Sequence, residues 1–424
     1  MPTLATLAHR RSSKVCLLII SCFFVATELK AHLGNMHYMN VSMVLGTDYL
    51  HPVLDGRVAR EAAALNASGH KVTIICWARS VSGEPISAPQ NEIVDGIHIH
   101  RIFSPVSTPE EPLLKRIFEH LKAKRLLSSA LNSIESDVIH FHDLDTAVIS
   151  FMNKLSKPFI YDAHEDYAGM ISHIKWPLPA LATLLERILV RKSDAIITVS
   201  PSIMKRLASY RPKRRLLILN SRSSDQFSTH ISSADIRNEL GIPSSKLLLL
   251  YIGSLGPGRS ILEAIDAANK STNNHLLLGG HGMWSAKVVE LVRDLENVTF
   301  LGTVPFEELS KYFLAADVIL GMRDPQVPDH AISLPNKFFE AAAAERPLLA
   351  SHGTFIGELV SKHRMGKLAE YGNVDSLLNT LDSLRDSKFR DTCGKAGLKL
   401  LQGEFGWKWQ ARKLNLLYNN LVKK

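Results

Sequence analysis

The sequence predicts an α/β protein made of two consecutive doubly wound Rossmann-like domains that face each other across a cleft. Short runs of consecutive apolar residues alternate with helical patterns, which is typical of parallel sheets covered on both faces. This series stops at a polar stretch over residues 221–246 and then begins again. The length of 424 residues is sufficient for two domains of ordinary size.

Residues 1–38 form a leader that we expect to lie outside the fold. The leader contains an apolar run from Val15 to Ala26, which is shorter than the about 20 residues that span a bilayer. The run has the proportions of a signal peptide, but Phe24 stands where cleavage requires a small residue. We therefore expect a misplaced start or a weak anchor, with the folded chain beginning near Met39.

The first domain is predicted over residues 39–220. Its first strand is NVSMVLG, and a helix over residues 57–70 follows and stops at Gly69. The later strands are, in chain order, KVTIICW, GIHIHRI, DVIHFH, FIYDAH, DAIITVS and RLLILN. A last helix over residues 405–424 carries regularly spaced apolar residues and is expected to join this domain.

The second domain is predicted over residues 247–404, after an interdomain connection over residues 221–246. Its strands are LLLLYIG, HLLLGG, NVTFLG, DVILGM and PLLAS. In open parallel sheets, ligands bind beyond the carboxyl ends of the strands, so the loops that follow these strands are the candidate site.

The first such loop is YIGSLGPGRS. Glycines let backbone amides approach an anion closely, and the helix that follows presents its positive end. An arginine at the helix start would offer guanidinium donors to a phosphate, although an ordinary glycine turn with a surface arginine would look the same. The candidate residues here are Gly253, Ser254, Gly256 and Arg259.

The second loop, LGGHGMW, again leads from a strand into glycines. Gly280 and His281 are its candidate binding residues. The alternative is a tight turn before a helix.

The third loop precedes the alanine-rich helix of SLPNKFFEAAAAERPLLAS. Alanine suits a helix that packs closely against a sheet. Backbone amides near the serine can face a diphosphate, the lysine adds charge, and the glutamate can accept hydrogen bonds from a ribose diol. The alternative is a solvent-facing glutamate placed favourably in the helix dipole. The candidate residues are Ser333, Leu334, Asn336, Lys337 and Glu340.

Motifs in both halves of the chain together resemble one family. They are DVIHFHDLD, YDAHEDY, DAIITVSPSI, YIGSLGPGRSILEAI, NVTFLGTVPFEELSKYFLAADVIL and LPNKFFEAAAAERPLLAS. This series resembles the family-4 (group 1) retaining glycosyltransferases of two-domain GT-B architecture from about residue 40 to the C-terminus. The resemblance implies a nucleotide-diphospho-sugar donor on the second domain and a glycan or lipid-linked acceptor facing the first. It also implies that Glu340 holds the donor ribose, that Arg259 neutralises the diphosphate, and that neither a metal nor a cofactor is needed.

Two positions depart from the family pattern. Ile332 occupies the place of a glutamate that contacts the donor sugar, and Ser254 occupies the place of an arginine after the strand. Two alternatives therefore stay open. One is an isomerase of the UDP-N-acetylglucosamine 2-epimerase type, for which Glu165 and Asp166 are the close carboxylate pair. The other is a non-catalytic partner subunit on the same scaffold.

Four residues of the first domain are candidates for the acceptor side or the reaction centre. Asp48 and Arg57 belong to the loop and helix start after the first strand, although Arg57 is equally compatible with a helix surface. His142 and His164 end two strands, where a histidine is more often structural than catalytic. The resemblance implies that His164 contacts the transferred sugar. Neither histidine has the Ser and Asp company that nucleophilic hydrolysis requires.

The charge indicates an anionic partner, because the net charge is +9. Two basic, apolar segments, LLKRIFEHLKAKRLL and HIKWPLPALATLLERILVRK, would suit peripheral contact with an anionic membrane, and ordinary amphipathic helices are the alternative. We see no nucleic-acid module. The four cysteines lack metal-binding spacing, so we expect a cytoplasmic protein without a metal site.

Overall fold

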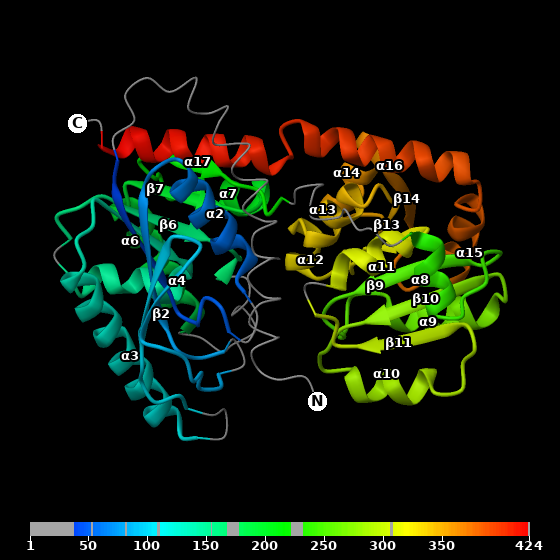
Figure 1. Ribbon diagram of the computed structural model, residues 1–424, viewed down its shortest axis with the longest axis horizontal. Coiled ribbons are helices and arrows are strands. Elements are labelled where there is room, and N and C mark those ends of the chain that lie inside the picture. The colour runs from blue at the N-terminus through cyan, green and yellow to red at the C-terminus, as the bar shows by residue number, and fades with distance from the viewer. Residues whose placement is uncertain are drawn as a thin grey trace. The chain divides into compact units, whose positions relative to one another are not determined.

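The computed structural model describes residues 38–51, 54–80, 83–107, 111–153, 155–167, 178–221, 232–305 and 308–422 (Figure 1). The chain divides into two compact units. The first unit consists of the residues up to Leu219 and those from Gln410 onward, and the second unit consists of Asn220–Trp409. The predicted leader, except for Tyr38, lies outside the described residues.

Within the described residues, the first unit contains an eight-stranded sheet of order β3-β4-β2-β1-β5-β6-β7-β8. Adjacent strands are parallel except for the edge pair β3 and β4. The central strands are buried almost throughout, as expected for a sheet covered on both faces. The strands are β1 (Asn40–Leu45), β2 (Lys71–Trp77), β3 (Asn91–Val94), β4 (Ile97–Ile102), β5 (Val138–His142), β6 (Phe159–Ala163), β7 (Ala195–Thr198) and β8 (Arg215–Leu217).

Helix α2 of the first unit begins and ends at residues suited to those positions. Asp55 caps α2, because its side chain accepts hydrogen bonds from the backbone N–H groups of Arg57 and Val58. Gly69 follows that helix in the left-handed region at φ +91°, where a Cβ would lie 2.5 Å from the Tyr38 ring. The helices of this unit are α2 (Gly56–Ala67), α3 (Leu113–Ser133), α4 (Asp143–Ala147), the 3-10 turn η1 (Val148–Phe151), α6 (Leu178–Lys192), α7 (Pro201–Ala208) and, from Gln410 onward, α17 (Trp407–Val422).

The C-terminal helix α17 packs on the first unit from Gln410 onward. The side chain of Gln410 accepts a hydrogen bond from the backbone N–H of Leu219 at 3.2 Å, and Lys413 donates to the carbonyl of Leu217. Leu414, Tyr418 and Leu421 of this helix are buried. The helix therefore closes the first unit with side chains from the far end of the chain.

The described part of the second unit forms a six-stranded parallel sheet of order β11-β10-β9-β12-β13-β14. Its strands are β9 (Leu247–Ile252), β10 (Asn274–Gly279), β11 (Val298–Gly302), β12 (Val318–Leu320), β13 (Leu348–Ser351) and β14 (Gly366–Ala369). Its helices are α8 (Ser233–Glu239), α9 (Ile261–Lys270), α10 (Ser285–Val292), α11 (Leu309–Ala315), α12 (Pro328–Ile332), α13 (Asn336–Ala343), α14 (Phe355–His363), α15 (Val374–Ser383) and α16 (Ser387–Gln402).

The predicted class of two parallel-sheet α/β domains is confirmed, with two differences of detail. β3 and β14 were not predicted, because one is a half-exposed antiparallel edge strand and the other a half-buried strand of four residues. The second difference concerns residues 232–246, which the sequence assigns to the connection. They contain α8, capped reciprocally by Ser232 and Asp235, and its Arg237 pairs with Asp317 of the second unit. None of the helices in the described ranges is both long and apolar enough to cross a membrane.

Candidate functional site

The first two glycine loops of the second unit meet at one edge of its sheet. The backbone N–H of Gly253 donates to the carbonyl of Gly279 at 3.0 Å, and that of Leu255 donates to the carbonyl of His281 at 2.8 Å. Gly280 has φ +131°, and a Cβ there would lie 1.8 Å from the carbonyl oxygen of Gly253, so only glycine fits. The carboxyl ends of β9 and β10 therefore lie in backbone contact.

Two residues of these loops are less constrained than the glycines at the strand ends. A Cβ on Gly256 would meet no described atom within 4 Å, so local packing does not require glycine there. The side chain of His281 is exposed. Both stay candidates on position alone.

Lys337 brings the third loop to the same place. Its Nζ lies 4.3 Å from the centre of the Tyr251 ring, and a Cβ on Gly253 would lie 2.6 Å from that Nζ. The Tyr251 hydroxyl donates to the carbonyl of Ser254 at 2.7 Å, which holds the ring under the ammonium group. Lys337 follows the first residue of α13, a helix whose N-cap residue, Pro335, makes no side-chain cap.

Two arginines add positive charge around this lysine. Burial, against the attraction of Glu340 and with the nearby positive charges of Arg323 and Arg259, lowers the pKa of Lys337 to about 8. Arg259 is half-buried and donates from Nη1 to the carbonyl of Pro257 at 3.1 Å. Three cations thus gather beside two glycine loops, an arrangement that suits an anion.

Arg323 was missed by the sequence reasoning. It lies after β12, where its backbone N–H donates to Ser351 Oγ at 2.9 Å and its Nη1 donates to Ser333 Oγ at 2.8 Å. The Oδ2 atom of Asp329 lies 3.9 Å from the same nitrogen. The signal was available, because a basic residue follows the predicted strand DVILGM as Arg259 follows β9.

Glu340 is buried, with 7% of its surface exposed. The alternative of a solvent-facing glutamate is therefore wrong. At the start of the same helix, the side-chain amide of Asn220 donates to Asn336 Oδ1 at 2.8 Å, and Leu334 is half-buried. These residues stay predicted donor contacts.

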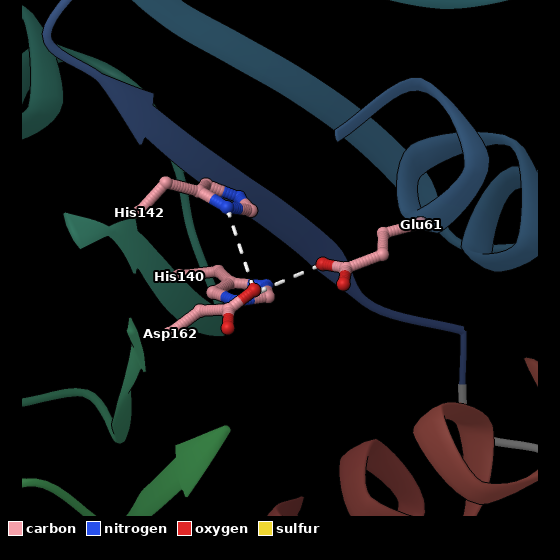
Figure 2. A group of neighbouring side chains, drawn as sticks. All are labelled: Glu61, His140, His142 and Asp162. Carbon is pink, nitrogen blue, oxygen red and sulfur yellow. Dashed lines mark ion pairs between the residues drawn. The ribbon is translucent and has the colours of Figure 1, made fainter. Parts of the chain in front are cut away.

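The first unit holds a buried cluster of two carboxylates and two imidazoles (Figure 2). Glu61 comes from α2, His140 and His142 from β5, and Asp162 from β6, and one ligand-type atom of each lies within 4.8 Å of the others. These are donor types that bind zinc. However, the guanidinium of Arg57 lies 3.0 Å from both Glu61 and Asp162 and already supplies a positive charge. We therefore interpret the cluster as a buried ion-pair network.

His164 lies at the edge of this network. Its Nε2 is 3.3 Å from Asp162 Oδ2 and 3.0 Å from His142 Nδ1. Its Nδ1 is 3.6 Å from Asp143 Oδ2, and its backbone N–H donates to Asp143 Oδ1 at 2.9 Å. Burial favours the neutral ring, but the carboxylates of Asp143 and Asp162 outweigh it and raise the pKa of His164 to about 10. His164 is therefore an imidazolium at neutral pH.

His142 and His164 have aspartate neighbours that the sequence did not lead us to expect. Asp143 was missed, although it directly follows strand β5, and its left-handed backbone at φ +64° is strained for a residue other than glycine. Asp162 was also missed, because it lies inside a strand that reads as buried. His142 is brought beside His164, as its place at a strand end suggested.

Two acceptor-side candidates prove to be buried ion-pair residues. Asp48 is 3% exposed, pairs with Arg101, and accepts the backbone N–H groups of Leu50 and His51 at 2.9 Å. The side chain of Arg57 is 4% exposed, so the helix-surface alternative is wrong. Its donors are directed to Asp162 and the carbonyl of Ile218, because α2 turns this residue toward the sheet. Both geometries indicate a structural role.

Comparisons with known proteins agree with this architecture. The chain matches the model of Glycosyltransferase Family 4 over residues 57–220 and that of Glycosyl transferases group 1 over residues 246–387. An uncharacterised glycosyltransferase of Methanocaldococcus jannaschii is 24% identical over 319 residues, covering 71% of this chain and 83% of that protein. WcaI of Escherichia coli K12, named provisionally as a colanic acid biosynthesis glycosyl transferase, is 25% identical over 189 residues, covering 42% of this chain and 46% of WcaI.

Solved structures share the whole fold. The sucrose-phosphate synthase of Thermosynechococcus elongatus has a TM-score of 0.70 at 19% identity, covering 90% of this chain and 99% of that one. Anabaena HepE, in complex with UDP-glucose, has a TM-score of 0.64 at 13% identity, covering 90% of this chain and 100% of that one.

Proposed function

This chain belongs to the group 1 glycosyltransferases, and from that premise we propose the finer features of its reaction. It transfers a sugar from a nucleotide-diphospho-sugar to a glycan or lipid-linked acceptor, with retention of configuration and without a metal ion. The pathway is the assembly of a polysaccharide or glycolipid in the cytoplasm, a proposal that the WcaI relative supports.

The gathering of Arg259, Arg323 and Lys337 around Tyr251 is the observation that carries this proposal. Like charges repel one another, and an anion bound among them relieves that repulsion. Breaking a sugar–diphosphate bond leaves negative charge on the departing phosphates. Fixed cations and helix-end amides stabilise that charge as it develops. In metal-dependent enzymes, a bound metal ion provides this stabilisation.

Glu340 and His164 take the remaining roles. The buried carboxylate of Glu340 accepts hydrogen bonds from the ribose diol of the donor. His164 contacts the transferred sugar, where its positive ring favours departure of the diphosphate. For retention, the acceptor hydroxyl attacks from the face that the diphosphate leaves, and the departing phosphate takes the hydroxyl proton.

The test is to incubate the full chain with a panel of nucleotide sugars and follow the products by mass spectrometry. Release of a nucleoside diphosphate with one donor, slow without acceptor, is the expected result. An epimerised nucleotide sugar would show the isomerase instead. Binding of no nucleotide by a folded protein would overturn the proposed donor site.

The acceptor side includes a face that suits an anionic membrane. On α3, exposed apolar side chains recur at i, i+3, i+4 and i+7, with Leu114 82% and Phe118 64% exposed. Exposed Lys122 and Arg125 lie on the same helix. The exposed large apolar residues of α3 and α6 are Leu114, Ile117, Phe118, Leu121 and Leu126 on α3 and Leu181, Leu184 and Ile188 on α6. Residues 173–177 of the second predicted segment lie outside the described residues.

We expect this face to bind vesicles containing phosphatidylglycerol and not vesicles of phosphatidylcholine alone. Phe118→Glu should reduce co-sedimentation with the anionic vesicles. Leu416→Glu is the control, because Leu416 is a similarly exposed leucine on α17. Equal binding by both variants would contradict the membrane contact.

A further inference from the structure

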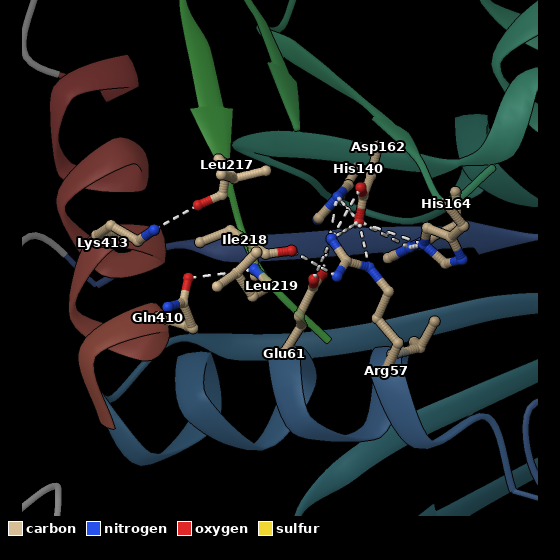
Figure 3. Close-up of polar contacts among 12 residues, drawn as sticks. Arg57, Glu61, His140, Asp162, His164, Leu217, Ile218, Leu219, Gln410 and Lys413 are labelled. Atoms are coloured by element: carbon tan, nitrogen blue, oxygen red, sulfur yellow. Dashed lines mark hydrogen bonds and ion pairs between the residues drawn. The ribbon is translucent and has the colours of Figure 1, made fainter. Parts of the chain in front are cut away.

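The buried groups behind His164 form one connected set that the proposed transfer does not use (Figure 3). We propose that Tyr418, His140 and Asp162 are positioning residues for His164. They form a buried relay that orients the His164 ring and keeps its Nε2 protonated. This inference rests on the proposed contact between His164 and the transferred sugar.

Asp162 is the centre of the relay. Its Oδ2 lies 3.3 Å from His164 Nε2 and 3.6 Å from His140 Nε2, and its side chain is fully buried. Two nitrogens of Arg57 donate to the same carboxylate at 3.0 to 3.1 Å. Although burial opposes ionisation, Arg57 and His164 hold the pKa of Asp162 well below its ordinary value. The group facing His164 is therefore a permanent carboxylate, fixed at two nitrogens by a guanidinium.

Tyr418 sets the proton position on His140. Its hydroxyl lies 2.8 Å from His140 Nδ1, and the tyrosine is fully buried. Burial raises the pKa of Tyr418 well above its ordinary value, and the carboxylates of Glu61 and Asp162 raise it further, so the hydroxyl keeps its proton. Because Asp162 Oδ2 and Glu61 Oε2 face His140 Nε2 at 3.6 and 4.0 Å, a single ring proton is favoured on Nε2, and the hydroxyl then donates to Nδ1.

His142 supplies a second acceptor to the His164 ring. Burial and the neighbouring His140 and His164 lower the pKa of His142 well below its ordinary value, so His142 is neutral. Its Nδ1 lies 3.0 Å from His164 Nε2, and the His140 ring stacks on it with 4.2 Å between ring centres. Acceptors on two sides of Nε2 therefore favour a proton at that nitrogen.

The other charged groups around His164 do not reverse this preference. Asp143 faces the opposite nitrogen, Nδ1, at 3.6 Å and favours a proton there as well. Arg57 opposes the positive ring, but it is itself neutralised by Asp162 and Glu61. His164 is thus held between two carboxylates as a doubly protonated ring.

As a purely structural feature, the relay would contribute little to the stability of the fold. Replacing a buried polar network by apolar residues of similar volume is often neutral or stabilising. Here the network reaches from α17 to the carboxyl end of β6, where the side chain of His164 is 17% exposed. A buried chain of charges that ends at one accessible ring is consistent with fixing the charge of that ring.

The test is an NMR titration of labelled histidines in the full chain, with the His164 signal assigned from His164→Gln. Wild-type His164 should remain doubly protonated up to about pH 8. Asp162→Asn should lower its titration midpoint by about one pH unit or more and reduce turnover about tenfold or more, with donor affinity unchanged. Tyr418→Phe, which keeps the ring, should shift the midpoint in the same direction by less.

The matched control is Tyr161→Phe. This change also removes a buried hydroxyl in the first unit, one that donates to Glu186 at 3.0 Å, and it should leave the His164 signal unmoved. Equal shifts of the His164 midpoint in Tyr418→Phe and Tyr161→Phe would overturn the relay. This comparison holds even if Asp162→Asn fails to fold. A wild-type midpoint in the ordinary histidine range, or one metal ion per chain in the purified protein, would overturn it too. A different outcome would count against the proposed function instead: His164→Gln keeps full turnover, while Asp162→Asn and Tyr418→Phe still shift the His164 midpoint as expected.

Discussion

Replacing Lys337 with methionine should stabilise the unliganded protein and weaken donor binding. The ammonium group lies over the Tyr251 ring, close to Gly253. Burial lowers its pKa from 10.5 to about 8, with Arg323 and Arg259 contributing and Glu340 opposing. At about 1.36 kcal/mol per pKa unit, a fall of this size amounts to at most about 3 kcal/mol.

The sign follows from which state holds its proton more weakly. The folded protein disfavours the charged lysine, so the penalty is fully present below about pH 8, where both states are charged. As the pH rises through the folded pKa, the folded lysine loses its proton first and the penalty disappears. The free energy of unfolding should therefore gain from this group as the pH rises from about 8 toward the unfolded pKa.

Urea unfolding near neutral pH and near pH 9.5 measures this contribution. Lys337→Met should exceed wild type by up to about 3 kcal/mol near neutral pH, with a smaller difference at the higher pH. Lys395→Met is the control, because Lys395 is exposed on α16 of the same unit and should change little at either pH.

Donor binding should change the protonation of Lys337. A diphosphate restores a partner to Lys337, so binding at about pH 8 should take up about half a proton, visible by calorimetry in buffers of different ionisation enthalpy. Lys337→Met should abolish this uptake. If Lys337→Met is no more stable than wild type, burial of the charged lysine does not destabilise the folded protein. Unchanged donor affinity of this variant would refute the contact between Lys337 and the diphosphate.

Three further predictions follow from the same geometry. Arg323→Ala should lower turnover about tenfold or more in steady-state kinetics, because a charge-assisted contact is worth about 1.5–3 kcal/mol, and near-normal rates would remove Arg323 from the anion site. Glu340→Ala should weaken nucleotide binding measured by calorimetry, whereas unchanged affinity would exclude the ribose contact. Asp48→Asn should cost about 3–5 kcal/mol of unfolding free energy by breaking the buried pair with Arg101, and should leave the acceptor KM unchanged. An altered KM in a stably folded Asp48 variant would return Asp48 to the acceptor side.

The fold was predictable because each central strand is a separate apolar run. LLLLYI is buried up to its last residue and VIHFH throughout, so their burial is visible without knowing their neighbours. β3 was not predictable in this way, because its residues alternate between exposed and half-buried and begin with Asn91 and Glu92. The helix α8 was missed because a short capped helix has the polar composition of a linker.

The convergence of the loops at the proposed anion site was largely predictable for a topological reason. Parallel strands place their carboxyl ends at one edge, so Gly253, Gly280 and Lys337 could be brought together from their loop positions alone. Arg323 obeys the same rule, and a search for every basic residue after a strand would have included it.

The network of the first unit follows from the alternation of side chains along a strand. His140 and His142 alternate along β5, so they share one face, and β6 pairs in register with His142 opposite Asp162. Polar side chains at every second position of a fully buried strand have no reason in core packing, so the motifs IHFH and YDAH already indicate a polar site. Arg57 and Tyr418 were beyond that rule. They reach the network across 105 and 278 residues, and their contacts depend on how two helices rotate against the sheet, which no local period records.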